Sequence, residues 1–190
     1  AEAEVEYADR QDASIYVKLE AVGDVVWEKK GSVLVGPTTG AASGQRIWPE
    51  ANRRWYFLVW TTTPWTLPAN VAIALHPDRE YQFIEIGKDE GWVVASSRAE
   101  FVGATFSRSL SAGVTYVKHG KHFKGLRYRR PFSSELGQVV LDEFVSMEEG
   151  TGIVHIAPGH GHEDYVIGQR EKLDTLSPVD HQGRFTDEVP

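Results

Sequence analysis

Two stretches of the sequence place polar side chains at a spacing that could serve chemistry. The first is a row of three threonines, residues 61–63, between an apolar run and Pro64. The second runs from His155 to Asp164, where a histidine on a glycine-framed apolar run precedes a Pro-Gly turn and an acid. A polar row at the end of a buried strand suits recognition of a small polar ligand. The histidine and the acid together form a second candidate pair.

The threonine row must be positioned by the segment that precedes it. Residues 55–60 are apolar and predict a buried strand that delivers the threonines to its carboxyl end. Pro64 pushes Thr63 toward an extended conformation, and Pro68 stiffens the next turn. A single threonine at the end of a strand is ordinary, because threonine is at home in strands and turns. Three in a row before Pro-Trp favour a binding role.

The histidine segment has the pattern of a strand, a loop and a helix start. Residues 152–157 predict the strand, and residues 162–173 predict a helix with acids in its first turn and Arg170 and Lys172 in its last. Taken singly, His155 is most often a hydrogen-bonded strand histidine and Asp164 a helix-start acid. The combination is a common way to build a small-ligand site.

The rest of the chain predicts a mainly β domain with a few short helices, an α+β fold resembling a barrel. Short runs rich in Val, Ile, Tyr and Trp alternate with Gly, Pro, Asp and Ser. These runs are residues 14–19, 32–35, 55–60, 71–75, 81–86, 92–95, 114–117, 138–141 and 152–157. A second helix is predicted after residue 96, with Ser97 and Glu100 as a capping box and Gly103 at its end. Residues 36–54 predict a long exposed loop or a hairpin.

Length and composition bound the function. A chain of 190 residues with 41% hydrophobic residues predicts one domain over residues 1–190. No stretch resembles a signal peptide or a membrane span, so we expect a soluble, cytoplasmic protein with no membrane partner. The absence of cysteine excludes disulfides and thiolate metal sites.

Charge is unevenly distributed. The net charge of −7 argues against nucleic-acid binding over much of the surface. One run is nevertheless strongly basic, residues 118–130, with Lys118, Lys121, Lys124, Arg127, Arg129 and Arg130 and no acid. The simplest interpretation is a solvated surface segment. Phe123 and Tyr128 between the charges keep single-strand binding open as the alternative.

Other catalytic chemistries find little support. Zinc ligands could come from His155, His160, His162, Glu163 and Asp164, but the helical His-x-x-x-His pair is absent. We therefore expect no metal and no cofactor. No Gly-x-Ser-x-Gly elbow of a serine hydrolase occurs, and the segment around Gly159 lacks the ending of a phosphate loop.

The segments "WTTTPWTLPANVAIALHP" and "GTGIVHIAPGHGHEDY" closely resemble the editing domain of isoleucyl-tRNA synthetase, and the resemblance extends over nearly the whole chain. Thr63 stands where the valyl and leucyl enzymes usually have Arg, and residues 158–161 read Pro-Gly-His-Gly where those enzymes have Pro-Ala-His-Asp. Both features indicate the isoleucyl branch. The chain lacks the His-Ile-Gly-His and Lys-Met-Ser-Lys-Ser signatures, so we expect it neither to activate isoleucine nor to charge tRNA.

The resemblance implies an enzyme that hydrolyses mischarged valyl-tRNA(Ile), and also valyl-adenylate, by a size-selective second sieve. The one methylene by which valine is smaller than isoleucine provides only about 1 to 3 kcal/mol of discrimination between the two amino acids, a limit for which the isoleucyl enzyme is itself the standard example. The implied partners are the acceptor end of tRNA(Ile), the valine moiety and the rest of the parent synthetase. The domain is expected to be a monomer cut from a larger class I enzyme.

The resemblance also implies residue roles. Asp164 would pair with the α-ammonium of the aminoacyl group, and His155 would exclude isoleucine and contact the terminal ribose. The catalytic set, in the sense of positioning water, is Thr62, Thr63, His155 and Asp164. The substrate-binding set is Thr61, Thr62, Thr63, Trp65, Asn70, His155, Gly161 and Asp164, with Trp65 expected mainly to support the pocket. The six basic residues of the run 118–130 would face the tRNA.

Two other readings stay open at this stage. The chain could be a module that binds the tRNA 3′ end or valyl-adenylate without efficient turnover, since a chain of net negative charge binds tRNA weakly. Salt-sensitive tRNA binding without hydrolysis would favour that reading. The chain could also be an unrelated β-barrel binding protein, which requires both motif matches to be accidental.

Overall fold

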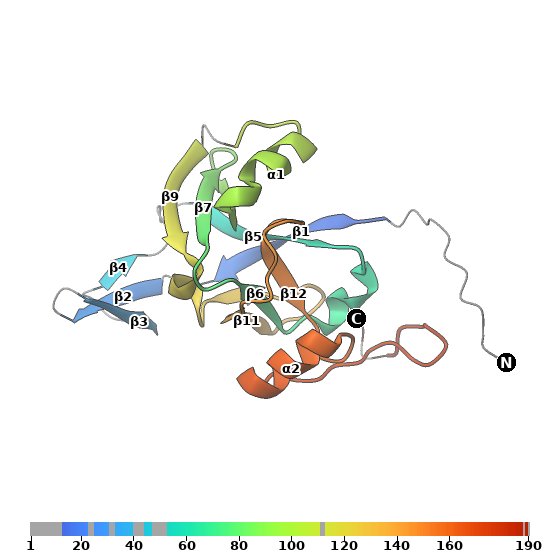
Figure 1. Ribbon diagram of the computed structural model, residues 1–190. Helices are drawn as coiled ribbons and strands as arrows, with labels where there is room; N and C mark the ends of the chain where they lie inside the picture. Colours follow the sequence, from blue (N-terminus) through green and yellow to red (C-terminus); the bar gives the residue numbers. More distant parts are fainter. Residues whose placement is uncertain are drawn as a thin grey trace.

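The computed structural model describes residues 13–22, 25–30, 33–39, 44–46, 53–110, 113–187 and 189 of the 190. Nine strands form one mixed sheet in the order β12-β6-β11-β10-β1-β5-β8-β7-β9 (Figure 1). Their bounds are β1 Ile15–Val22, β5 Arg54–Thr61, β6 Ala72–Leu75, β7 Glu80–Glu85, β8 Glu90–Ala95, β9 Val114–His119, β10 Arg127–Arg129, β11 Leu136–Leu141 and β12 Ile153–Ile156. Neighbours are antiparallel except for the pairs β5–β8 and β6–β11.

The large sheet curls toward a barrel. Strand β12 lies at one end of the hydrogen-bonded order, yet it also packs against β5. The N–H of Ala95 at the end of β8 donates to the carbonyl of Thr151 just before β12, at 2.9 Å. The carboxyl end of β5 therefore lies beside β12, which brings the two candidate stretches together.

Strand β5 is buried on both faces, which explains its continuous apolar sequence. On one face Phe57 joins a cluster with Phe83 and Phe123, in which the rings of Phe83 and Phe123 stack at 5.6 Å. On the other face Leu58 packs beneath the helix α1, Ala99–Thr105, through Val102. Both faces hold the strand rigidly up to Thr61.

The remaining helices are short. They are η1 Pro64–Ala69, η2 Ser96–Arg98, η4 Gly120–Phe123 and α2 His162–Glu171. Helix α2 covers β6, β11 and β12 through Ile167, which packs with Ala74, Val140 and Ile156. Its first turn is thereby fixed over the end of β12.

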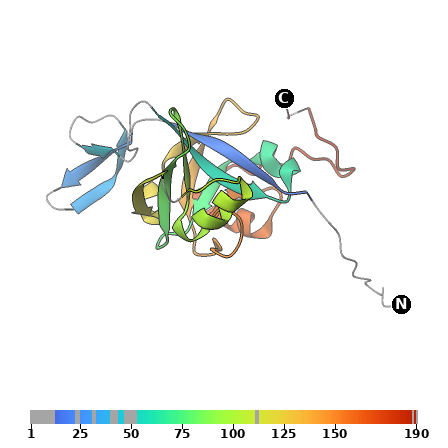
Figure 2. The ribbon, with the colours of Figure 1, turned by 90° about the horizontal axis from the view of Figure 1, so that it is seen from above.

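The predicted mainly β fold is confirmed, and each of the nine predicted runs overlaps a strand. Strand β10 and two strands of a separate small sheet were not predicted. That small sheet comprises β2 Val25–Lys30, β3 Val33–Thr39 and β4 Gly44–Arg46, in the order β3-β2-β4 (Figure 2). The predicted loop or hairpin of residues 36–54 is therefore strand at 36–39, 44–46 and 54, and residues 40–43 and 47–52 lie outside the described residues.

The predicted capping box is wrong. Ser97 lies within η2, and helix α1 begins after Arg98 without a side-chain cap. Gly103 does not end the helix, which continues to Thr105. Gly103 is buried within the helix, and a Cβ there would approach the side chain of Leu110 at 3.2 Å. Packing of α1 on the sheet overrides the local capping signal. Helix α2 ends two residues earlier than predicted, where Lys172 takes a left-handed conformation.

No helix among the described residues has the length and apolar character that a membrane crossing requires.

Gly137 on β11 faces Tyr128 on β10, and an added Cβ would overlap the buried tyrosine ring. Gly137→Ala is expected to lower the free energy of unfolding by about 1 to 3 kcal/mol, because the ring has no space to move into. Urea denaturation measures this. Gly87→Ala is the matched control, since a Cβ at Gly87 meets nothing within 4 Å and should leave stability unchanged or raise it by up to about 1 kcal/mol. Equal stabilities of the two variants would contradict the packing described.

Candidate active site

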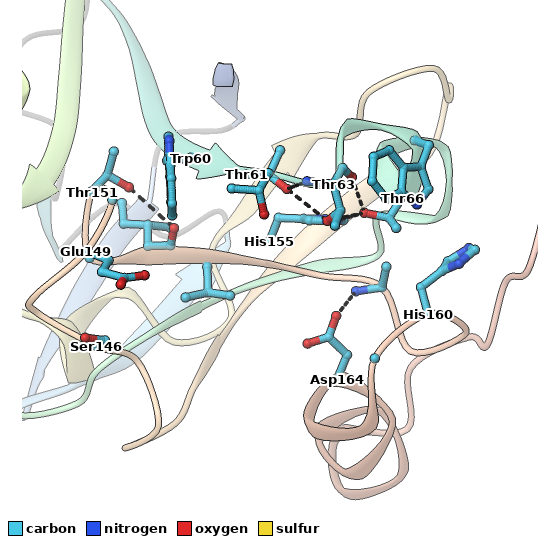
Figure 3. Close-up of a pocket in the computed structure, with 18 residues that line it drawn as sticks. Trp60, Thr61, Thr63, Thr66, Ser146, Glu149, Thr151, His155, His160 and Asp164 are labelled. Atoms are coloured by element: carbon cyan, nitrogen blue, oxygen red, sulfur yellow. Dashed lines mark hydrogen bonds between the residues drawn. The ribbon is translucent and has the colours of Figure 1, made fainter. Parts of the chain in front are cut away.

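A pocket of about 480 Å³ opens where the end of β5, the turn η1, strand β12 and the start of α2 meet (Figure 3). The loop of residues 146–152 closes its remaining side. The residues that line it are Trp60, Thr61, Thr62, Thr63, Trp65, Thr66, Ser146, Glu149, Gly150, Thr151, Gly152, Ile153, Val154, His155, Ala157, His160, Gly161 and Asp164. None of these lining residues is a lysine or an arginine.

The threonine row is held by bonds among its own members. The hydroxyl of Thr61 accepts the N–H of Thr63 at 3.0 Å and lies 3.2 Å from the Thr63 hydroxyl. The hydroxyl of Thr66, one turn into η1, donates to the Thr63 carbonyl at 2.8 Å. Thr62 is exposed, and its hydroxyl has no partner within the described part of the chain. The row therefore presents a free hydroxyl on a rigid turn.

His155 is nearly buried, and both of its ring nitrogens are engaged. Nε2 lies 2.7 Å from the Thr66 hydroxyl, and Nδ1 lies 3.0 Å from the Nδ2 of Asn70. Asn70 is fully buried; its Nδ2 also donates to the carbonyl of Ala72, and its Oδ1 accepts the hydroxyl of Tyr128 at 2.6 Å. Because the amide nitrogen faces His155, Nδ1 must accept and Nε2 must carry the proton.

This environment keeps His155 neutral. Burial, together with the smaller effect of the nearby His160, lowers the pKa of its imidazole to about 4. With Nδ1 accepting and Nε2 donating, the ring has no free lone pair for proton abstraction. His155 therefore forms a neutral wall of the pocket and holds its neighbours in place.

Asp164 is the carboxylate at the start of α2. Its Oδ2 accepts the N–H of Ala157 at 2.8 Å, and the carboxyl group packs closely on Gly161, where a Cβ would lie 3.3 Å from the Asp164 Cγ. Burial raises the pKa of Asp164, the Ala157 bond lowers it, and Glu163 raises it. The lining residues provide no positive charge to balance this carboxylate. A cationic group on a ligand would supply the missing countercharge.

No protein-family model matches the chain. The isoleucine–tRNA ligase of Thermotoga neapolitana is 43% identical over 194 residues, which cover 100% of this chain and 18% of that protein. The isoleucine–tRNA ligases of Persephonella marina and Carboxydothermus hydrogenoformans are 39% and 41% identical, each over 17% of its length. The chain thus spans less than a fifth of the relatives it matches.

Solved structures show the same fold. The crystal structure of GlLeuRS-CP1 matches with a TM-score of 0.61 at 20% identity, covering 83% of this chain and 59% of that one. The editing domain of the cytosolic leucyl-tRNA synthetase of P. falciparum matches with a TM-score of 0.53 at 17% identity, covering 64% of this chain and 48% of that one. The chain is thus similar over its whole length to a segment of isoleucine–tRNA ligases, and it has the fold of the leucyl-tRNA synthetase editing domains.

The fold brings most of the predicted site residues together. The pocket is lined by Thr61, Thr62, Thr63, Trp65, His155, Gly161 and Asp164. Asn70 does not line it; it lies behind His155, so it can act on a ligand only through that ring. The side chain of Trp65 is 53% exposed, so the indole borders the opening instead of supporting the pocket from below.

Sequence reasoning missed several residues of the site. Thr66 bonds His155 directly and Tyr128 bonds Asn70 behind it, although neither was singled out for this role. Glu149 and Thr151 line the side of the pocket facing β5 (Figure 3). The only signal for these two was a polar segment directly before the glycine-framed strand. Gly150 there has φ +58°, and its carbonyl accepts the Nε of Arg98.

The structure separates the six basic residues of the run 118–130. Arg130 is buried and paired with Glu135, and Arg129 pairs with Glu20 at 3.1 Å. Lys124 lies 4.0 Å from Glu171, and Arg127 donates to Gln138. Within the part of the chain that the structure describes, Lys118 on β9 and Lys121 on η4 form no ion pair, and contact of the run with tRNA stays a prediction.

The aromatic residues of that run are not available for stacking. Phe123 and Tyr128 are fully buried in the core of the fold, so the alternative of single-strand binding through them is wrong. The histidine-rich segment also gathers no metal ligands: among the described residues, no three His, Asp or Glu side chains form a group that could hold an ion.

The pKa of His155 predicts a pH dependence of stability. An unfolded histidine titrates near pH 6.5, whereas His155 in the fold titrates near 4. As pH falls below about 6.5 the unfolded chain takes up the proton first, so this contribution to stability is complete above that pH and is lost toward pH 4. The expected loss between pH 7 and pH 5 is about 2 kcal/mol from this group. NMR titration of the ring checks it, and a midpoint near 6.5 would contradict the burial described.

Proposed function

We propose that this editing domain hydrolyses valine from mischarged tRNA(Ile), and also accepts valyl-adenylate. The observation that carries the proposal is the composition of the pocket, which combines the carboxylates of Asp164 and Glu149, two imidazoles and a row of hydroxyls and contains no lysine or arginine. Such a pocket suits a small aminoacyl ester bound through its ammonium group. The 39–43% identity to isoleucine–tRNA ligases supports valine as the amino acid that needs removal.

Selection by size follows from the rigidity of the walls. His155 is fixed by two hydrogen bonds, and the threonine turn is fixed by η1 and its bonds to Thr61 and Thr66. Since both ring nitrogens are engaged, His155 presents carbon atoms toward the pocket. A fixed apolar edge of this kind admits valine and excludes a side chain larger by one methylene.

Asp164 would anchor the substrate. Its Oδ1 is not used in the bond to Ala157, so it can accept the α-ammonium of the aminoacyl group. The ion pair would form in a partly buried position, where a charge-assisted hydrogen bond contributes about 1.5 to 3 kcal/mol. Binding of the ammonium would also reverse the rise in the pKa of Asp164 that burial causes.

The chemistry requires no protein nucleophile. A water molecule oriented by the hydroxyls of Thr62 and Thr63 would attack the ester carbonyl carbon, and the bond from that carbon to the ribose oxygen would break. The water proton passes to the ribose oxygen, so the products are valine and a free tRNA end. Hydroxyl and backbone N–H donors of the turn would stabilise the developing oxyanion. His155 takes no proton in this scheme.

Asp164→Asn should lower kcat/KM for release of valine from valyl-tRNA(Ile) by about 10 to 100-fold, because the amide still accepts the Ala157 N–H but carries no charge. Deacylation assays with this chain, using valyl-tRNA(Ile) and isoleucyl-tRNA(Ile), measure it. Glu163→Gln is the matched control, as it removes an exposed charge from the same helix turn and should retain activity within about twofold.

Two results would contradict the proposal. Equal release of valine and isoleucine by the unchanged chain would exclude size selection. Salt-sensitive binding of tRNA with release of neither amino acid would favour the alternative of a binding module that needs its parent enzyme for turnover.

The basic run would help to receive the tRNA acceptor end. Lys118→Glu combined with Lys121→Glu should weaken binding of tRNA(Ile) several-fold at low salt, since about one phosphate contact is lost with each lysine. Fluorescence anisotropy measures the affinity, and Lys88→Glu in the β7–β8 turn is the control for a change in net charge. Binding of a non-hydrolysable valyl-adenylate analogue should not change. An unaltered tRNA affinity would remove these lysines from the interface.

A further inference from the structure

The buried hydrogen bonds behind the pocket run in one direction along a chain of five groups. The Tyr128 hydroxyl donates to Asn70 Oδ1 at 2.6 Å, and Asn70 Nδ2 donates to His155 Nδ1 at 3.0 Å. His155 Nε2 then donates to the Thr66 hydroxyl at 2.7 Å, which donates to the Thr63 carbonyl at 2.8 Å. The chain begins in the core of β10 and ends at the threonine row.

The direction agrees at both ends of this chain of bonds. Two bonds hold the Asn70 amide in this orientation: Nδ2 donates to the carbonyl of Ala72, which can only accept, and Oδ1 accepts from Tyr128, so loss of the Tyr128 donor leaves only one of them. At the other end the single hydroxyl proton of Thr66 is used on the Thr63 carbonyl, so Thr66 must accept from His155. Both arguments assign the proton of His155 to Nε2.

Tyr128 is the outermost donor of this chain. It is fully buried on β10, between the outward-facing Arg127 and Arg129, and Gly137 across the strand pair leaves space for its ring. Burial raises the pKa of the Tyr128 hydroxyl far above neutrality, so its proton is always present for donation. Without that donor, Asn70 Oδ1 would be a buried acceptor with no partner.

We propose that Tyr128 is a positioning residue of the editing site, which acts through Asn70 to hold His155 in the Nε2–H tautomer and thereby fixes the threonine row through Thr66. The proposal rests on the proposed hydrolysis for its kinetic part only. Its structural part concerns the ring of His155 and can be tested without any substrate.

The consequence for the pocket is geometric. If His155 carried its proton on Nδ1, Nε2 would accept from Thr66, and the Thr66 hydroxyl could no longer donate to the Thr63 carbonyl. The turn would then lose one of the bonds that hold the threonines at the end of β5. Tyr128 thus influences the threonine row without lining the pocket.

The decisive experiment compares the chain with Tyr128→Phe by nitrogen NMR of the His155 ring. In the unchanged chain we expect Nδ1 to be unprotonated and Nε2 protonated. In Tyr128→Phe we expect a mixture of tautomers and a titration midpoint shifted upward, toward 6.5. Tyr81→Phe is the control, because it removes an equally buried hydroxyl that donates to the Gly152 carbonyl outside this chain of bonds. It should leave the His155 signals unchanged.

Kinetics provide the second readout. Tyr128→Phe should lower kcat for release of valine by about tenfold with little change in KM, because the residue orients groups and does not touch the substrate. If neither chain releases valine, the proposed hydrolysis fails while the NMR result still decides the role of Tyr128.

If Tyr128→Phe does not fold, Thr66→Val tests the other end of the hydrogen-bond chain. This variant removes the acceptor of the His155 Nε2–H, and Thr66→Ser should restore the tautomer. His155 signals identical in the folded Tyr128→Phe variant and the unchanged chain would overturn the proposal.

Discussion

The pocket depends on the side-chain amide of Asn70. This one fully buried group makes three hydrogen bonds, to the Ala72 carbonyl, the Tyr128 hydroxyl and His155 Nδ1, and so links β6, β10 and β12. Each bond satisfies a polar group that is buried away from water. When one partner is lost, the group that is left without a hydrogen bond destabilises the fold by the full free-energy cost of its desolvation. The position and the protonation of the pocket wall follow from this arrangement.

The electrostatics of the site are set by burial more than by charge pairs. Desolvation lowers the pKa of His155 and raises that of Asp164, so both groups are driven toward their neutral forms. A site with no internal countercharge favours a ligand that brings its own. An amino acid ester has such an ammonium group, whereas its side chain must fit a wall with no free polar atom on His155. Charge therefore anchors the ligand, and shape selects it.

The walls of the pocket are made rigid at both ends of the hydrogen-bond chain that runs from Tyr128 to Thr63. At one end, Pro64 and the short helix η1 fix the threonine turn, and this effect depends only on residues that are neighbours in the sequence. At the other, Tyr128 is held by the sheet, because Gly137 on the adjoining strand leaves the space that its ring fills. The site thus joins a locally stiff turn to a core position that only the completed sheet can form.

The sequence alone predicted nine of the strands, the threonine turn and the resemblance to isoleucyl-tRNA synthetases, because runs rich in β-branched residues, Pro64 and the two motif segments are local signals. It also identified Asp164 and His155, which lie within those motifs. Only the tertiary structure decided that Asn70 lies behind the pocket, that Glu149 lines it, and that Arg130 and Tyr128 of the basic run are buried. The failed capping box at Ser97 has the same cause, since packing of α1 on the sheet outweighs a local cap. Partners 58 and 85 residues apart meet only when the sheet curls, and no local pattern encodes which buried groups will then face one another.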